Sequence, residues 1–180
     1  MTASLTPLDA HLGARPTRPT VPLAELRRTV RRYALNPNLA ALLPETGKSP
    51  QPSAARLAGD ARTDVWLISW PEGSQTGWHD HGDAAGAFAV ASGAVEELTW
   101  ALGTVQHRRL TWGSPHGVGE GDSRAFGRDH VHNVVGAGPG RTLTVHAYAP
   151  GLVSMGEFEL AAEGPVRLAT NRGDADGGSW

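Results

Sequence analysis

The chain has 180 residues, of which 39% are hydrophobic, and a formal net charge of −2. This length suits one domain with a buried core, and the charge excludes a strongly basic surface for nucleic acid or anionic membranes. The absence of cysteine excludes disulfides, cysteine nucleophiles and thiolate metal sites. No apolar stretch reaches the roughly 20 residues that span a bilayer, and the N-terminal stretch lacks the apolar core of a signal peptide. We therefore expect a cytoplasmic monomer without a nucleic-acid or membrane partner.

Residues 1–45 are expected to form an N-terminal arm and a helical segment that packs on the rest of the domain. The arm is rich in proline and threonine. Beyond it, apolar residues recur at helical spacing, at Leu23, Leu26, Val30 and Tyr33, while arginines fill the opposite face. The sequence NPN at 36–38 interrupts this helical pattern.

The segment 46–170 is expected to form an all-β barrel. From residue 64 onward, short runs rich in β-branched and aromatic residues are separated by Gly, Pro, Asp and Ser. These runs predict strands at 64–70, 87–93, 94–102, 105–112, 124–126, 130–135, 141–149 and 158–162. No alternation of strands with helices follows, and residues 171–180 are expected to form a disordered tail.

The stretch GWHDHG contains two histidines, His79 and His81, one residue apart. Side chains alternate along a strand, so both rings should project from one face. Imidazole is a good ligand for Zn, Cu, Fe and Ni, and two rings on one strand can occupy neighbouring coordination positions. An isolated HxH more often marks a polar strand edge than a metal site, so the surrounding sequence has to decide.

The spacing around this pair resembles the first motif of the cupin superfamily, G-x5-H-x-H-x3,4-E-x6-G. Gly73 precedes His79 by five intervening residues, and Gly93 stands at the closing position. Gly86 replaces the glutamate ligand of the motif. A second histidine cluster, DHVHNVVG, follows about fifty residues later, where the second cupin motif supplies another ligand. The resemblance implies a small jelly-roll barrel with an all-histidine metal site.

From about Arg56 to Tyr148 the chain is similar to bacterial members of the cysteine dioxygenase family, the thiol dioxygenases of the cupin superfamily. The residues that carry this resemblance are WLISWPEGSQTGWHDHG, VHNVVG and TVHAYAPG. It implies Fe(II) held by His79, His81 and His132. His130 stays open as the third ligand, because it shares a strand face with His132 and fits the generic cupin pattern after Gly127.

The triplet Thr144, His146 and Tyr148 resembles the S-x-H-x-Y signature of the same family, with threonine in place of serine. Alternation places the three side chains on one strand face. The resemblance implies a catalytic relay, in which Thr144 orients His146 and His146 positions the Tyr148 phenol near the metal. The thioether that some relatives form with this tyrosine is excluded here, since Gly86 stands at the cysteine position.

Arg56 is expected to bind the substrate carboxylate, because the cysteine-specific branch carries its arginine ahead of the corresponding strand and guanidinium binds carboxylates bidentately. Arg62 is the competing candidate. The related mercaptopropionate branch has its arginine after the tyrosine, where this chain has none, and Ala149-Pro150 resembles the Ser-Pro peptide of cysteine dioxygenases.

The resemblance therefore predicts oxidation of L-cysteine by O2 to cysteine sulfinic acid. The alternatives are a dioxygenase for another small thiol such as 3-mercaptopropionate, a metal-dependent cupin of another class such as an isomerase or a quercetinase-like oxygenase, and a non-enzymatic sensor. The remaining histidines, His11, His107 and His116, match no motif and are expected at the surface.

Overall fold

The computed structural model describes residues 21–43, 50–113 and 121–172. The expectations for the N-terminal arm, for His11 and His116, and for most of the C-terminal tail lie outside these residues. Within them, no helix has the length and apolar character needed to cross a membrane.

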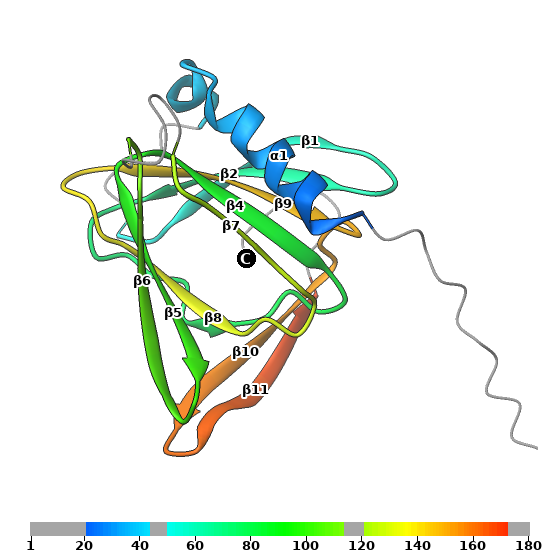
Figure 1. The fold of residues 1–180 in the computed structure, drawn as a ribbon, viewed down its shortest axis with the longest axis vertical. Coiled ribbons are helices and arrows are strands. Elements are labelled where there is room, and N and C mark those ends of the chain that lie inside the picture. Colours follow the sequence, from blue (N-terminus) through cyan, green and yellow to red (C-terminus); the bar gives the residue numbers. More distant parts are fainter. Residues whose placement is uncertain (1–20, 44–49, 114–120, 173–180) are drawn as a thin grey trace, which may run out of the picture.

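Two antiparallel sheets face each other and form the barrel (Figure 1). One sheet has the order β1 (Ser53–Gly59), β2 (Asp64–Trp70), β9 (Thr142–Ala149), β4 (Ala85–Ser92) and β7 (Ser123–Phe126). The other has the order β11 (Gly164–Arg172), β10 (Ser154–Ala161), β3 (Trp78–His79), β8 (His132–Gly136), β5 (Ala94–Ala101) and β6 (Thr104–Thr111). This arrangement confirms the predicted all-β, cupin-type barrel.

Helix α1 (Leu23–Ala34) covers the outer surface of the five-stranded sheet, against β4 and β9 (Figure 1). Leu26, Val30 and Ala34 form its buried stripe, while Leu23, which the helical spacing placed in that stripe, is 40% exposed. Its charges suit the helix dipole, with Glu25 in the first turn and two arginines in the last. After the interruption, a short 3-10 turn, η1 (Leu39–Leu42), ends the helical segment.

Two strands, β1 and β11, were not predicted, and a third, β3, is shorter than the strand expected to carry both His79 and His81. β1 and β11 form sheet edges. They carry many exposed residues, so no hydrophobic periodicity marks them. β11 also runs to Arg172, two residues beyond the predicted start of the tail. β3 is only two residues long, so His81 lies in the following turn and not in a strand.

The five-stranded sheet is buried on both faces. Residues of β2, β4 and β9 that point outward pack with α1 in one apolar cluster. Residues that point inward, including Trp66, Trp70, Phe88 and Tyr148, form a second cluster inside the barrel. The alternation of each strand therefore separates a helix-covered core from the barrel interior, where the histidines lie.

Candidate metal centre and active site

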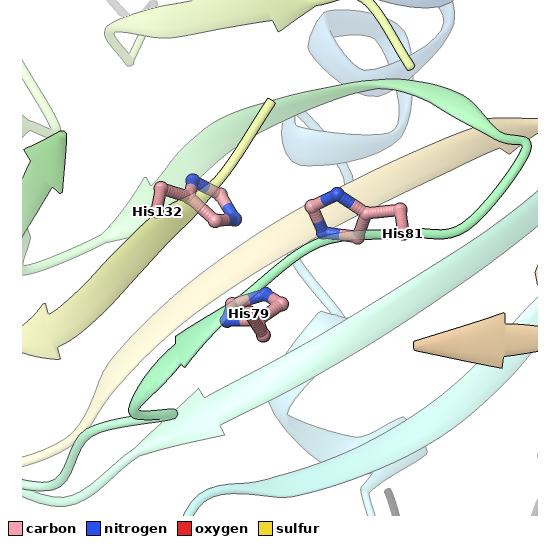
Figure 2. A group of neighbouring side chains, drawn as sticks. All are labelled: His79, His81 and His132. Atoms are coloured by element: carbon pink, nitrogen blue, oxygen red, sulfur yellow. The ribbon is translucent and has the colours of Figure 1, made fainter. Parts of the chain in front are cut away.

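His79, His81 and His132 meet inside the barrel (Figure 2). His79 and His132 are directly opposite each other on β3 and β8, and His81 reaches the same place from the turn after β3. One ligand atom from each ring lies within 4.8 Å of the others. The three residues are at most 6% exposed. The structure thus brings together the three histidines to which the sequence assigns the metal.

Hydrogen bonds leave one nitrogen of each ring available to a metal. Nδ1 of His79 donates to the Gly77 carbonyl at 3.0 Å, and Nδ1 of His132 donates to the Glu97 carboxylate at 3.0 Å. Both contacts place the proton on Nδ1 and leave Nε2 as a lone-pair donor. Both ring nitrogens of His81 are buried without a hydrogen-bond partner. Such a group costs about 1–3 kcal/mol when unsatisfied, and a bound metal ion would satisfy it.

The three rings are held in the neutral form that coordinates metals. Burial lowers the pKa of His79, and burial together with the neighbouring histidines lowers the pKa of His81 and His132 well below the usual value. Metal binding needs the deprotonated ring nitrogen. The donor set therefore fits a divalent metal of the kind that imidazole prefers.

Asp80, between the two histidines, fixes the turn that carries His81. Its Oδ1 accepts hydrogen bonds from the backbone N–H of Gly82 at 3.0 Å and of Gly156 at 2.8 Å. Its Oδ2 pairs with Arg167 of β11. Burial opposes the charged form, but these three donors hold the pKa of Asp80 below its usual value. Two of these partners, Gly156 and Arg167, lie on the β10–β11 hairpin, far along the chain from Asp80.

His130 lies beside the centre but is turned toward Glu97. Its Nε2 donates to Glu97 Oε1 at 2.9 Å, the same oxygen that His132 contacts. Glu97, His130 and His132 also lie close enough for a metal site of their own. Arg124 Nε, however, is 2.7 Å from Glu97 Oε2, and this positive charge disfavours a cation there. Of the two candidates for the third ligand, the geometry groups His132 with His79 and His81.

Thr144, His146 and Tyr148 form a continuous hydrogen-bonded chain on the inner face of β9. Thr144 Oγ1 is 2.8 Å from His146 Nε2, and the Tyr148 hydroxyl is 3.2 Å from His146 Nδ1. Trp70, which the sequence did not suggest, extends the chain by donating its indole N–H to Thr144 Oγ1 at 2.7 Å.

Indole N–H can only donate, so Thr144 Oγ1 accepts from Trp70. A hydroxyl oxygen can accept a second hydrogen bond, so the direction of the two bonds to His146 follows its tautomer. With the proton on Nδ1, His146 accepts from Thr144 and donates to the Tyr148 oxygen, and the Tyr148 O–H is available to a group in the pocket. Burial lowers the pKa of His146 to about 3 and raises the pKa of Tyr148, so both groups stay neutral near pH 7.

Gly86 lies opposite Tyr148 on β4, in agreement with its place in the family pattern. A Cβ at this position would be 2.5 Å from the Phe126 ring. That ring fills the space, since it stacks on His81 and on His130 with centroid distances of 4.9 and 4.7 Å. An aromatic side chain from β7 thus occupies the position from which a glutamate or cysteine would reach the centre.

A pocket of about 520 Å³ opens beside His79 and His132. Its volume is in the ordinary range for a small-molecule site. Trp66, Trp70, His146, Tyr148 and Met155 are among the residues that form its wall. Among the described residues, its polar wall residues are neutral amides and hydroxyls in addition to the histidines and Tyr148, and none of them is an arginine or a lysine.

Arg56 does not line this pocket. It lies on β1, opposite Trp66 of β2, and its guanidinium pairs with Asp64. Asp64 in turn accepts the backbone N–H of Leu152 at 3.1 Å and lies opposite Tyr148. Arg62, the other candidate, is exposed in the turn between β1 and β2. Arg56, the expected carboxylate anchor, therefore lies near the Tyr148 end of the barrel, but its guanidinium is paired with the Asp64 carboxylate of the protein itself.

His107 is exposed on β6, as expected, and pairs with Glu96 at 3.0 Å. The peptide between Ala149 and Pro150 is cis.

Three solved structures illustrate the similarity of the barrel to known folds. A protein with a double-stranded β-helix domain from Klebsiella pneumoniae subsp. pneumoniae is 19% identical over 63% of this chain and 87% of that one, with a TM-score of 0.48. KdgF from Halomonas sp. is 18% identical over 58% and 85%, with a TM-score of 0.47. A cupin domain from Bordetella pertussis is 20% identical over 57% and 97%, with a TM-score of 0.43.

Among curated protein sequences, none matches the chain significantly. The family model described as cysteine dioxygenase type I matches residues 17–160, a range that contains both histidine clusters, the chain from Thr144 to Tyr148, and Arg56. The protein therefore belongs to the cysteine dioxygenase type I family.

Proposed function

We propose that this protein is an Fe(II)-dependent thiol dioxygenase that converts L-cysteine and O2 to cysteine sulfinic acid. One observation carries the proposal: the three buried histidines meet at a pocket whose wall also contains Tyr148, held by His146. Membership of a family of dioxygenases supports the reaction class. Both oxygen atoms of O2 end on the substrate sulfur, so the reaction balances without an external reductant.

His79, His81 and His132 would hold the iron through one nitrogen each. These ligands are neutral, so an anionic sulfur is a favourable further ligand, and the pocket beside His79 and His132 has room for it. Bound Fe(II) supplies the activation of O2 and of the thiolate. The metal preference of imidazole alone would also admit zinc or nickel, so iron is the part of this assignment that family membership supports.

Tyr148 would donate its O–H to the substrate or to the reacting oxygen. The chain from Trp70 through Thr144 and His146 fixes the phenol by hydrogen bonds at each step. Because His146 is neutral near pH 7, this chain orients the phenol without adding a charge to the pocket. The aromatic and apolar walls formed by Trp66, Ile68 and Leu152 reduce the access of water, which strengthens such a polar contact.

Arg56 would hold the carboxylate of cysteine, and its position supports this role only in part. Residues opposite each other on paired strands share a face, so Arg56 starts from the same inner face as Trp66. Its guanidinium would have to share its donors between Asp64 and the substrate. The side chain is about half exposed, so it has freedom to turn.

A second candidate function is the oxidation of a small thiol that has no carboxylate. The observation in its favour is that the part of the pocket wall formed by described residues contains no arginine or lysine. A thiol such as cysteamine would use the same metal site and the same Tyr148 contact, and Arg56 would then serve only its ion pair with Asp64.

Oxygen uptake by the iron-loaded protein with L-cysteine, 3-mercaptopropionate and cysteamine tests these assignments. We expect L-cysteine to have the highest kcat/KM. Arg56→Ala should lower kcat/KM for cysteine by an amount equivalent to about 2–5 kcal/mol of transition-state binding free energy, the usual loss for a partly desolvated charge pair. It should leave cysteamine turnover and iron content unchanged. Arg62→Ala is the matched control and should leave kcat/KM for cysteine, cysteamine turnover and iron content unchanged.

Each outcome points to a different assignment. A constant ratio of cysteine to cysteamine turnover in Arg56→Ala would remove Arg56 from the substrate site. The best activity with cysteamine would favour the second candidate. No oxygen uptake with any thiol by a protein that retains its iron would contradict the proposed reaction.

A further inference from the structure

Glu97 is a fully buried carboxylate at the edge of the candidate metal centre. Its side chain is 0% exposed and lies on β5, next to the first residues of β8. Oε1 accepts hydrogen bonds from His130 at 2.9 Å and from His132 at 3.0 Å. Oε2 lies 2.7 Å from Arg124. A buried carboxylate is strongly destabilising unless it is paired, and here three groups converge on it: Arg124 of β7, His132 of β8, and His130 from the segment between these strands.

We propose that Glu97 is the positioning residue of the metal centre. It holds the His132 ring so that Nε2 faces His79 and His81, and it supplies through His132 the negative charge that the three ligands lack. An imidazole that donates its N–H to a carboxylate becomes a stronger electron donor at its other nitrogen, and such partners typically contribute 10–100-fold to metal affinity. This inference rests on the metal site of the proposed function.

The surrounding contacts favour this role over a second metal site at Glu97. Both histidines donate protons to Glu97 Oε1, so neither contacting nitrogen has a free lone pair. Arg124 adds a positive charge on the other oxygen. His130 therefore acts as a second donor to the carboxylate, beside the ligand and outside the ligand set.

The neighbouring residue offers a matched control. Glu96 on the same strand points to the opposite face and pairs with His107 of β6 at 3.0 Å. Both side chains are more than one third exposed, so this second Glu–His pair is solvated, unlike the buried pair of Glu97 and His132. Glu96→Gln removes the same charge from the same strand.

The test measures Fe(II) affinity against a competing chelator under anaerobic conditions, and the Fe(III)/Fe(II) midpoint potential without substrate. Glutamine has nearly the shape of glutamate and keeps one acceptor oxygen, so Glu97→Gln mainly removes the charge. We expect it to weaken Fe(II) binding about 10–100-fold and to raise the potential, because a lost negative charge destabilises Fe(III) more than Fe(II). Glu96→Gln should change neither value.

Arg124→Gln provides a prediction of opposite sign and remains informative if Glu97→Gln does not fold. Removal of the arginine charge leaves the Glu97 carboxylate less neutralised, so the potential should fall and Fe(II) affinity should be retained. An unchanged potential in both variants, or a change equal to that of Glu96→Gln, would overturn the role of Glu97. Failure of the wild-type protein to bind Fe(II) would instead contradict the proposed function.

Discussion

The two faces of β9 are both buried, yet they differ completely in chemistry. The outward residues Leu143, Val145 and Ala147 belong to the apolar cluster under α1. The inward residues Thr144, His146 and Tyr148 are joined to each other and to Trp70 by hydrogen bonds. The outward face stabilises the fold by removing apolar surface from water. The inward face can be polar at this depth because each of its polar groups has a partner.

Burial alone therefore does not distinguish the residues that stabilise this barrel from the residues that form its candidate active site. All eight residues of β9 are buried. What separates the faces is their partner, an amphipathic helix on one side and the candidate metal centre with its pocket on the other. Substitutions on the outward face should therefore change stability, and substitutions on the inward side should change chemistry at nearly constant stability.

The largest expected effect is loss of a metal ligand on the inward side. His79→Ala, His81→Ala and His132→Ala should each lose their iron and their activity, because two imidazoles retain Fe(II) poorly. His130→Ala should keep most of its iron, since the His130 Nε2 is hydrogen-bonded to Glu97 and His130 lies outside the group of three ligands. Iron content after anaerobic loading and desalting measures this. An iron-free His130→Ala beside an iron-loaded His132→Ala would reverse the assignment of the third ligand.

The next effect concerns the hydroxyl at the end of the inward chain. Tyr148→Phe removes one oxygen and keeps the ring that packs near His81, at a centroid distance of 5.0 Å. We expect iron content to stay near wild type while kcat falls about 10²–10⁴-fold, the usual range for a positioned proton donor. Steady-state oxygen uptake gives the answer, and full activity would remove the Tyr148 hydroxyl from the mechanism.

On the outward side, Leu26→Ala should lower the free energy of unfolding by about 2–5 kcal/mol, the usual cost of such a core truncation. Leu26 is 0% exposed and belongs to the cluster that contains Val145. Urea unfolding measures the loss, and iron affinity and kcat of the folded fraction should match wild type. A fall in kcat without a fall in stability would break the contrast between the two faces.

The smallest effect is the pH dependence that His146 gives to the metal-free protein. Its pKa is about 3 in the folded chain because of burial, against an ordinary value near 6.5 when unfolded. Between these values the unfolded chain binds one more proton, so the free energy of unfolding decreases as the pH falls below about 6.5. The contribution of one proton is about 1.4 kcal/mol per pH unit.

Urea unfolding of the metal-free protein at pH 6 and pH 5 measures this dependence. The other buried histidines contribute in the same direction, so the comparison needs His146→Gln, in which the slope should be smaller by about one proton. An equal slope in the two proteins would show that His146 is not kept neutral by burial.

The barrel and the core of the site could be predicted because their signals are local. β2 matches its predicted range 64–70, and the helix at Leu23–Ala34 follows from one amphipathic pattern. The edge strands β1 and β11 could not be predicted in this way, since no residue of β1 is fully buried and most of β11 is exposed, so neither carries a clear apolar alternation. The resemblance assigned Arg56 to the substrate carboxylate, but the sequence did not reveal its ion pair with Asp64.

By itself, the sequence determined which side chains share a face. The shared face of Thr144, His146 and Tyr148 needs only the alternation of an extended backbone, whereas His81 reaches the side of His79 from the turn after β3. The tertiary structure decided the partners. Trp70 meets Thr144 across 74 residues, and Glu97 meets His132 across 35. Such contacts depend on strand order and register, which are set by the burial of the whole sheet and not by any short stretch of the chain.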